Sequence, residues 1–245
     1  MIKVLVNGAR GKMGQEVART VERENELALV GQADMDDKLE DAIWFTNPDV
    51  VVDFTHHSVV KNNAIRILNS KCHAVIGTTG LSDADLAEIN DLAQTQQRGV
   101  LVCPNFAIGA VLMMRCAAEI AKYMPSVEII ELHHDRKGDA PSGTALKTID
   151  MIHRSNPYVN GNGTNTLETE LIPGARGGRR HNIPVHSVRL PGFVAHQEVI
   201  FGGVGQTLSI RHDSISRESF MPGVIIGIRK VVHITGLVYG LETIL

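Results

Sequence analysis

Residues 1–14 read MIKVLVNGARGKMG, an apolar stretch that passes directly into a turn with glycine at every third position. The apolar residues 2–6 are typical of a buried strand. After the turn, Met13, Val17 and Val21 recur at helical spacing and predict a helix. A strand, a glycine-rich turn and a helix in this order indicate the first βα unit of an α/β fold.

The same alternation continues through the first hundred residues. Further strand-like runs occupy residues 27–33, 50–54, 73–77 and 100–103, and helix-like segments separate them. One of these segments opens with Ser82 followed three residues later by Asp85, which is the pattern of a helix capping box. Nearly continuous apolar strands joined by helices predict a parallel sheet covered on both faces. We therefore expect a Rossmann-like, doubly wound domain over residues 1–106.

The pattern changes after a helix predicted over residues 107–123. Strands are now joined by turns, at residues 127–132, 183–190, 193–201 and 206–212, with Pro191-Gly192 as a type II turn pair. These features predict a second, α+β domain on a mainly antiparallel or mixed open sheet, over residues 107–213.

Two further segments complete this division of the chain. The sequence NGNGTN at residues 160–165 predicts an irregular surface loop. A last helix, with Val224, Ile228 and Val231 on one side and Pro222 in its first turn, is predicted to return to the first domain. We therefore assign residues 214–245 to that domain.

Composition excludes several classes of protein. The formal net charge of −3 gives no general attraction to nucleic acid, and no apolar run approaches the roughly 18 residues that a membrane span needs. The amino terminus lacks the pattern of a signal peptide, so we expect a soluble, cytoplasmic protein. Three cysteines without CxxC spacing, and a His56-His57 pair without a third ligand, predict neither a disulfide framework nor a metal site.

The glycine turn predicts a dinucleotide cofactor. Its GxxGxxG pattern differs by one inserted residue from the GxGxxG fingerprint, and Asp34 closes the second strand 20 residues beyond Gly14, where a carboxylate accepts hydrogen bonds from ribose hydroxyls. That carboxylate favours NADH and repels a 2′-phosphate; NADPH is the second option if Arg10, Lys12 or Lys38 offsets the repulsion. A turn that binds another ligand stays open as an alternative. The candidate residues are Gly8, Arg10, Gly11, Lys12, Met13, Gly14 and Asp34.

Two more segments follow strands of the same predicted sheet. Residues 77–80 read GTTG after the fourth strand, and residues 104–106 read PNF after the fifth. Ligands of open α/β sheets bind at the carboxyl ends of the strands, so these segments are expected near the nicotinamide. The candidate residues are Gly77, Thr78, Thr79, Cys103, Pro104, Asn105 and Phe106.

Residues 131–145, reading ELHHDRKGDAPSGTA, concentrate chemically active side chains. His133 and His134 leave the end of a predicted strand with side chains on opposite faces. Ser142 then opens a predicted helix whose first turn, with Gly143 and Thr144, presents backbone N–H groups to an anion. A histidine pair at a strand end is structural more often than catalytic, but the adjoining anion turn and Lys137 favour a site for a small dicarboxylate.

Five motifs taken together, GARGKMG, VVDFT, VIGTTG, PNFAIG and ELHHDRKGDAPSGTA, resemble those of the dihydrodipicolinate reductase family over nearly the whole chain. The resemblance implies a homotetramer that reduces 4-hydroxy-tetrahydrodipicolinate to tetrahydrodipicolinate with NAD(P)H, in lysine and diaminopimelate biosynthesis. It implies that His133 is the proton donor and Lys137 the second catalytic residue. It further implies that the substrate is bound by His134, Ser142, Gly143 and Thr144, with Thr79 facing the point where cofactor and substrate meet.

Two other functions remain open at this point. Aspartate-semialdehyde and homoserine dehydrogenases share an amino-terminal dinucleotide domain, but the first needs a nucleophilic cysteine, for which Cys103 is the candidate. A non-catalytic NADH sensor belongs to a different class and would leave His133 and Lys137 without a role.

Overall fold

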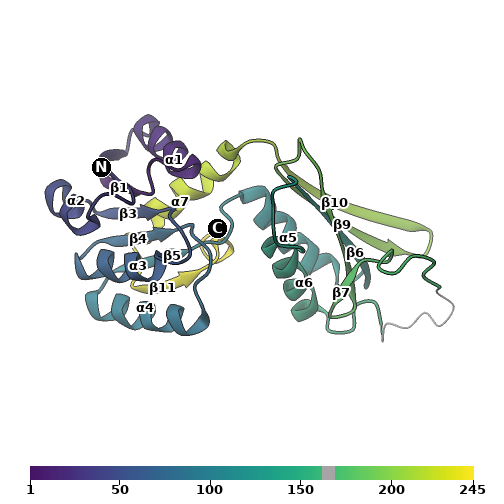
Figure 1. Ribbon diagram of the computed structural model, residues 1–245. Helices are drawn as coiled ribbons and strands as arrows, with labels where there is room; N and C mark the ends of the chain where they lie inside the picture. The colour runs from purple at the N-terminus through teal and green to yellow at the C-terminus, as the bar shows by residue number, and fades with distance from the viewer. Residues whose placement is uncertain (162–168) are drawn as a thin grey trace. The chain divides into compact units, whose positions relative to one another are not determined.

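The computed structural model describes residues 1–161 and 169–245 (Figure 1). The loop predicted at residues 160–165 therefore lies largely outside the described residues. The chain forms two compact units: unit 1 comprises Met1–Ile108 and Arg217–Leu245, and unit 2 comprises Gly109–Ser216.

Unit 1 contains a parallel sheet of six strands in the order β11-β5-β4-β3-β1-β2 (Figure 1). The chain runs from β1 to β2 at one edge and then crosses back to β3 on the other side of β1, so the strand order reverses between β1 and β3. This topology confirms the predicted Rossmann-like fold, in which ligands bind at the carboxyl ends of the strands near that reversal. The strands are β1 (Ile2–Asn7), β2 (Leu27–Ala33), β3 (Val50–Asp53), β4 (His73–Ile76), β5 (Gly99–Val102) and β11 (Gly236–Tyr239).

Helices cover both faces of this sheet. Helices α1 and α7 lie on one face, and α2, α3 and α4 lie on the other (Figure 1). Because helices cover both faces, consecutive strand residues are buried, as Val50, Val51 and Val52 are in β3. The helices are α1 (Lys12–Arg23), α2 (Leu39–Thr46), α3 (Val60–Asn69), α4 (Asp83–Gln96) and α7 (Met221–Val231), with short 3₁₀ turns at η1 (Arg217–Phe220) and η2 (Leu241–Thr243).

The carboxyl-terminal segment Arg217–Leu245 is part of unit 1. Helix α7 packs on the sheet with Val224 and Ile228 fully buried, and Pro222 lies in its first turn. Strand β11, which the sequence analysis did not predict, then pairs in parallel with β5. The predicted capping box is also present, because Ser82 accepts a hydrogen bond from the Asp85 backbone and the Asp85 side chain accepts one from Ser82.

Unit 2 contains a mixed sheet of five strands in the order β10-β9-β6-β8-β7. Strands β6 and β8 are parallel, because the chain between them passes through α6, and the other neighbours are antiparallel. The prediction of a mainly antiparallel or mixed sheet is thus confirmed. Its elements are α5 (Ile108–Ile120), β6 (Ser126–His133), α6 (Gly143–Ser155), β7 (Gly178–Arg180), β8 (Ile183–Arg189), β9 (Ala195–Gly203) and β10 (Gln206–Ser214).

One face of this sheet packs against α5 and α6 (Figure 1). Val199 and Phe201 of β9 point to that face and are fully buried, together with Ile149 and Ile152 of α6. The alternate residues of β9, such as Glu198 and Ile200, are only half-buried. Within the described residues, no helix covers that second face of the sheet.

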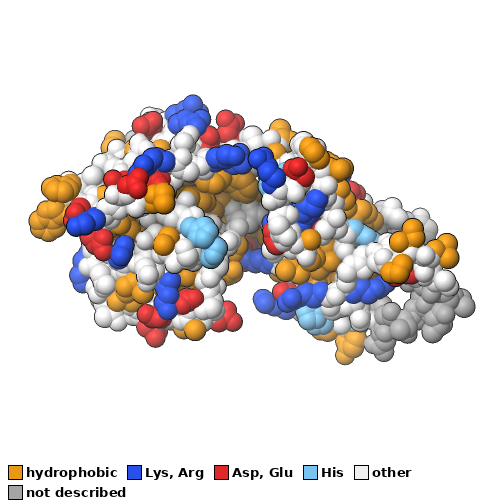
Figure 2. Space-filling model, viewed as in Figure 1, with side chains coloured by type: hydrophobic (Ala, Val, Ile, Leu, Met, Phe, Trp, Pro, Cys, Tyr) orange, Lys and Arg blue, Asp and Glu red, His pale blue; other side chains and the backbone are white. Residues whose placement is uncertain are grey.

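The surface gives two further observations. Acidic and basic side chains are interspersed over the face of unit 1 drawn in Figure 2. Among the described residues, no helix combines the length and the apolar character that crossing a lipid bilayer requires.

Candidate active site

The glycine turn between β1 and α1 has the close approaches that a dinucleotide site needs. Gly8 adopts a φ of +81°, and a Cβ atom at Gly14 would lie 2.1 Å from the Gly8 carbonyl oxygen. Gly11 is the N-cap of α1 without a side-chain capping bond, and the first turn of α1 has no acidic residue. The amino end of α1 is therefore suited to a pyrophosphate, so the residues present fit a dinucleotide.

Asp34 follows β2, beside the glycine turn. Its carboxylate accepts hydrogen bonds from the backbone N–H groups of Met35 at 2.9 Å and Arg10 at 2.7 Å. These two bonds hold the pKa of Asp34 below its usual value, so the carboxylate is charged at neutral pH. The Arg10 guanidinium is itself engaged by Asp36 at 3.0 Å and Asp37 at 3.6 Å.

Asp53, a fully buried residue at the end of β3, organises the neighbouring strand ends. Its carboxylate accepts hydrogen bonds from Asn7 at 2.8 Å, from Asn63 at 2.9 Å and from the hydroxyls of Thr55 at 2.7 Å and Thr78 at 2.9 Å. The Thr78 hydroxyl also accepts a hydrogen bond from the Thr55 backbone at 2.8 Å. Thr78 therefore shapes the loop from within rather than presenting a free hydroxyl to a ligand.

The remaining predicted cofactor residues differ in accessibility. Thr79 is exposed, whereas a Cβ atom at Gly77 would lie 2.0 Å from the Phe54 ring. Cys103 and Phe106 are 1% and 2% exposed, so any contact with a cofactor would come from their backbone. Pro104 is exposed, and the side-chain oxygen of Asn105 accepts a hydrogen bond from the Ala107 backbone at 2.8 Å. A buried Cys103 does not suit the nucleophile that an aspartate-semialdehyde dehydrogenase needs.

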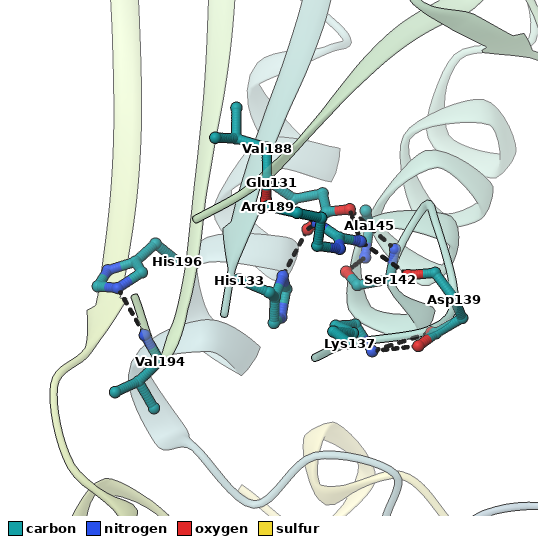
Figure 3. A network of polar contacts seen from close by, with 10 residues as sticks. All are labelled: Glu131, His133, Lys137, Asp139, Ser142, Ala145, Val188, Arg189, Val194 and His196. Carbon is teal, nitrogen blue, oxygen red and sulfur yellow. Dashed lines mark hydrogen bonds and ion pairs between the residues drawn. The ribbon is translucent and has the colours of Figure 1, made fainter. Parts of the chain in front are cut away.

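In unit 2, the predicted catalytic residues gather between the end of β6 and the start of α6 (Figure 3). His133 is the last residue of β6, and its side chain is 14% exposed. Lys137 lies in the following loop, where its ammonium donates to both carboxylate oxygens of Asp139, at 2.7 and 2.9 Å. The Nδ1 atom of His134 is buried without a hydrogen-bond partner in the described part of the chain. Buried polar atoms without a partner are uncommon in folded proteins.

The amino end of α6 lies where the sequence predicts an anion-binding turn. Ser142 is the N-cap, and its hydroxyl accepts a hydrogen bond from the Ala145 backbone at 3.2 Å. The next residue, Gly143, is exposed, and a Cβ atom built there would meet nothing within 4 Å. The first turn contains no acidic side chain, so it offers N–H groups, a favourable dipole and open space to a carboxylate.

Three residues of this network were not identified as functional from the sequence: Glu131, Asp139 and Arg189. Glu131 is fully buried, and its carboxylate receives hydrogen bonds from His133 at 2.5 Å and from Arg189 at 2.7 and 2.9 Å (Figure 3). Glu131 could have been found, since residues i and i+2 of a strand lie on the same face. No local signal marks Arg189, which belongs to another strand.

Burial raises the pKa of Glu131, but hydrogen bonds from His133, Arg189 and Ser187 outweigh it and lower the value to about 2. Because the pKa of Glu131 is lower in the folded chain than its ordinary value of 4.5, the ionised carboxylate stabilises unit 2 at pH values above 4.5. This stabilisation is lost as the pH falls towards 2.

We expect the melting-temperature difference between the wild type and Glu131→Gln to be largest near neutral pH and to shrink below about pH 4.5. Thermal unfolding at several pH values, followed by circular dichroism, measures this difference. A difference that stays constant from pH 7 to pH 3 would contradict an ionised Glu131.

Comparison with known proteins identifies the family. Residues 2–106 match the family described as "Dihydrodipicolinate reductase, N-terminus", and residues 109–245 match "Dihydrodipicolinate reductase, C-terminus". The chain belongs to the dihydrodipicolinate reductase family. It is therefore an oxidoreductase of a family that depends on NAD(P)H and acts in lysine and diaminopimelate biosynthesis.

The chain aligns with individual relatives over nearly the whole length of both sequences. The chain is 49% identical to a 4-hydroxy-tetrahydrodipicolinate reductase of Desulfitobacterium hafniense, covering 100% of this chain and 98% of the relative. It is 47% identical to one of Listeria innocua, with 100% of both chains covered. A solved structure of dipicolinate-bound dihydrodipicolinate reductase from Paenisporosarcina sp. TG-14 matches with a TM-score of 0.90 and 44% identity, over 100% of both chains.

Proposed function

We propose that this chain reduces 4-hydroxy-tetrahydrodipicolinate to tetrahydrodipicolinate, with NAD(P)H as the reductant. The observation that carries the proposal is the grouping of His133, His134 and Lys137 with the amino end of α6 in a family of this activity. The relatives bear the name of this reductase, and the Paenisporosarcina structure contains dipicolinate, a small dicarboxylate.

We assign the cofactor to the first domain and the substrate to the second. The glycine turn Gly8–Gly14, Asp34 and the strand ends at Gly77–Thr79 and Cys103–Phe106 would hold the dinucleotide. One carboxylate of the substrate would bind at Ser142, Gly143 and Thr144, because these residues form the start of α6. His134, the first residue after β6, would bind the substrate through its imidazole ring.

After the 4-hydroxyl group has left the substrate as water, a bound nicotinamide would supply a hydride to the conjugated ring that results. Negative charge then develops on the ring, and the Lys137 ammonium stabilises it. Asp139 holds that ammonium at 2.7 Å in the structure, and a substrate carboxylate would compete with Asp139 for it. His133 completes the reduction by donating a proton, a task for which an imidazole is suited near neutral pH.

The decisive assay follows the absorbance of the reduced nicotinamide. Purified protein is mixed with NADH or NADPH and the freshly prepared condensation product of pyruvate and aspartate semialdehyde. We expect the absorbance to fall only when protein, substrate and cofactor are all present. No fall with either cofactor would overturn the proposed function.

We further propose that NADH is the preferred cofactor. The charged carboxylate of Asp34 would accept hydrogen bonds from ribose hydroxyls and repel a 2′-phosphate. The Arg10 guanidinium lies 4.0 Å from Asp34 but is shared with Asp36 and Asp37, so it offsets only part of this repulsion.

Replacement of Asp34 by serine should raise the ratio of kcat/KM for NADPH to that for NADH by about tenfold, because relief of ~1.4 kcal/mol of repulsion changes an equilibrium by that factor. Steady-state kinetics with both cofactors measure the ratio. Asp41→Ser, at an exposed position of α2, is the control and should leave the ratio unchanged. An unchanged ratio in Asp34→Ser would show that another residue selects the cofactor.

We also propose that the chain assembles as a homotetramer. The sheet face of unit 2 opposite α5 and α6 supports an assembly, since Ile130 and Ile200 lie on it half-buried beside the Glu198–Arg211 pair. Light scattering after size-exclusion chromatography should give about four times the 26.7 kDa of one chain. The cytoplasmic location stays a prediction from the sequence.

A further inference from the structure

The buried carboxylate of Glu131 has no part in the reaction as described above. It lies on β6 two residues before His133, with 0% of its side chain exposed. Withdrawing a carboxylate from water is unfavourable, and buried ion pairs can often be replaced by apolar residues without loss of stability. A charged group in this position therefore calls for an explanation beyond the stability of the sheet.

The contacts of Glu131 fix the orientation of the His133 ring. The Oε2 atom of Glu131 lies 2.5 Å from Nδ1 of His133. An ionised carboxylate can only accept hydrogen bonds, so Nδ1 carries the proton in this contact. The other ring nitrogen, Nε2, is then the one left to exchange a proton with a ligand.

Arg189 connects this pair to the loop that carries Lys137. It lies on β8 directly opposite His133 in the parallel register, and its guanidinium binds both oxygens of Glu131. The same guanidinium donates to the Asp139 backbone carbonyl at 2.7 Å, and Asp139 holds Lys137 through its side chain (Figure 3). The Glu131 carboxylate also accepts a hydrogen bond from the Ser142 backbone at 3.3 Å.

We propose that Glu131 and Arg189 are positioning residues of the reductase: Glu131 holds His133 in the tautomer that presents Nε2, and Arg189 holds Glu131 together with the Lys137 loop. This inference rests on the proposed function, in which His133 donates the proton. The guanidinium balances the carboxylate charge, so Glu131 can support the ring both before and after the proton leaves.

The chain contains a matched control for this pair. Glu128 lies on the same strand, three residues earlier and on the opposite face, and it too accepts hydrogen bonds from an arginine and a histidine. Its partners are Arg176 at 2.5 Å and His186 at 2.9 Å. Neither partner belongs to the proposed site, so Glu128→Gln removes a similar but more exposed network, with 34% of the Glu128 side chain exposed, without touching His133. Because Glu128 lies on the sheet face assigned to the assembly, light scattering checks that this variant keeps the wild-type oligomeric state.

The test compares Glu131→Gln, Glu131→Asp and Glu128→Gln in the full-length protein. We expect Glu131→Gln to lower kcat roughly 10- to 100-fold. An effect of this size is typical when a residue that orients a functional side chain is removed, as is known for residues that hydrogen-bond to the ligands of a metal. The NADH dissociation constant, measured by fluorescence, and the substrate KM should change by less than about threefold. Glu131→Asp keeps the charge but shortens the side chain, so it should give an intermediate kcat, and Glu128→Gln should keep the wild-type kcat.

The pH profile separates positioning from a structural role. The charged groups around His133 are Glu131 on β6, Arg189 on β8 and the Lys137–Asp139 pair in the loop. Without the carboxylate, a protonated ring loses its anionic partner, so the pH above which kcat falls should be lower in Glu131→Gln than in the wild type. Equal kcat and equal pH profiles in Glu131→Gln and Glu128→Gln would overturn the inference.

Failure of the inference and failure of the proposed function give different results. A wild-type protein without reductase activity refutes the proposed function, whereas an active wild type with an equally active Glu131→Gln refutes only the positioning role. If Glu131→Gln does not fold, Arg189→Lys serves instead, since it keeps the charge and loses the paired hydrogen bonds. A kcat reduced about tenfold or more in folded Arg189→Lys would support the inference, and an unchanged kcat would overturn it.

Discussion

Replacement of Lys137 by alanine should lower kcat about 100- to 1000-fold while NADH still binds, because the loss of one group that stabilises developing negative charge has an effect of that size. The Lys137 ammonium lies in the loop after β6, with 22% of its side chain exposed, and Asp139 holds it on one side. The ammonium is therefore accessible to a negatively charged group of the substrate. Initial rates with saturating NADH, together with a fluorescence titration of NADH, measure the two effects separately.

This experiment also separates the reductase from a non-catalytic NADH sensor. A sensor would keep its response to NADH and would have no turnover to lose. Lys122→Ala is the control. The ammonium of Lys122, in unit 2, forms an ion pair with Glu119 in the described structure, and this lysine lies outside the proposed site. Wild-type turnover in Lys137→Ala would remove Lys137 from the mechanism.

Replacement of Gly14 by alanine should abolish most cofactor binding and destabilise unit 1 by roughly 1–3 kcal/mol, the usual range for overpacking. The new Cβ atom would lie 2.1 Å from the Gly8 carbonyl oxygen and 2.8 Å from the Cα atom of Ala9. Both contacts are with backbone, so the turn must open and the amino end of α1 must move. Thermal unfolding and NADH titration measure the two consequences.

Gly11→Ala is the matched control in the same turn. Its Cβ atom would approach the Gly8 carbonyl oxygen only to 3.2 Å, and the backbone of Gly11 has a φ of −69° that alanine readily adopts. We expect a clearly smaller loss of stability than in Gly14→Ala. Equal losses in the two variants would show that steric crowding at Gly14 does not determine the shape of the turn.

The parts of the candidate site that the sequence predicts are those built from neighbours in the chain. The glycine turn, the histidines at the end of β6 and the N-cap Ser142 each depend on residues within one or two turns of backbone. Backbone geometry of this kind follows from local steric and hydrogen-bonding preferences, which the sequence displays directly. The ends of the first five strands of unit 1 were predicted to within one residue, because buried parallel strands are nearly continuous apolar runs.

Contacts between segments that are far apart in the chain could not be predicted from the sequence. From the sequence, the Thr78 hydroxyl was expected to be available to a ligand. In the structure it instead donates a hydrogen bond to Asp53, 25 residues earlier. Strand β11 was missed because only its pairing with β5 distinguishes its four residues from a loop. In both cases the hydrogen-bonding partner is determined by tertiary packing of the sheet and not by the local sequence pattern.

The sequence by itself determined the doubly wound sheet, the dinucleotide turn and the segment that carries His133 and Lys137, because periodicity and local capping are written in consecutive residues. Only the tertiary structure decided what supports His133. Arg189 is 58 residues from Glu131, and the parallel pairing of β6 with β8 brings its guanidinium within 2.7 Å of the carboxylate. Strand register sets that distance, and register depends on the whole sheet.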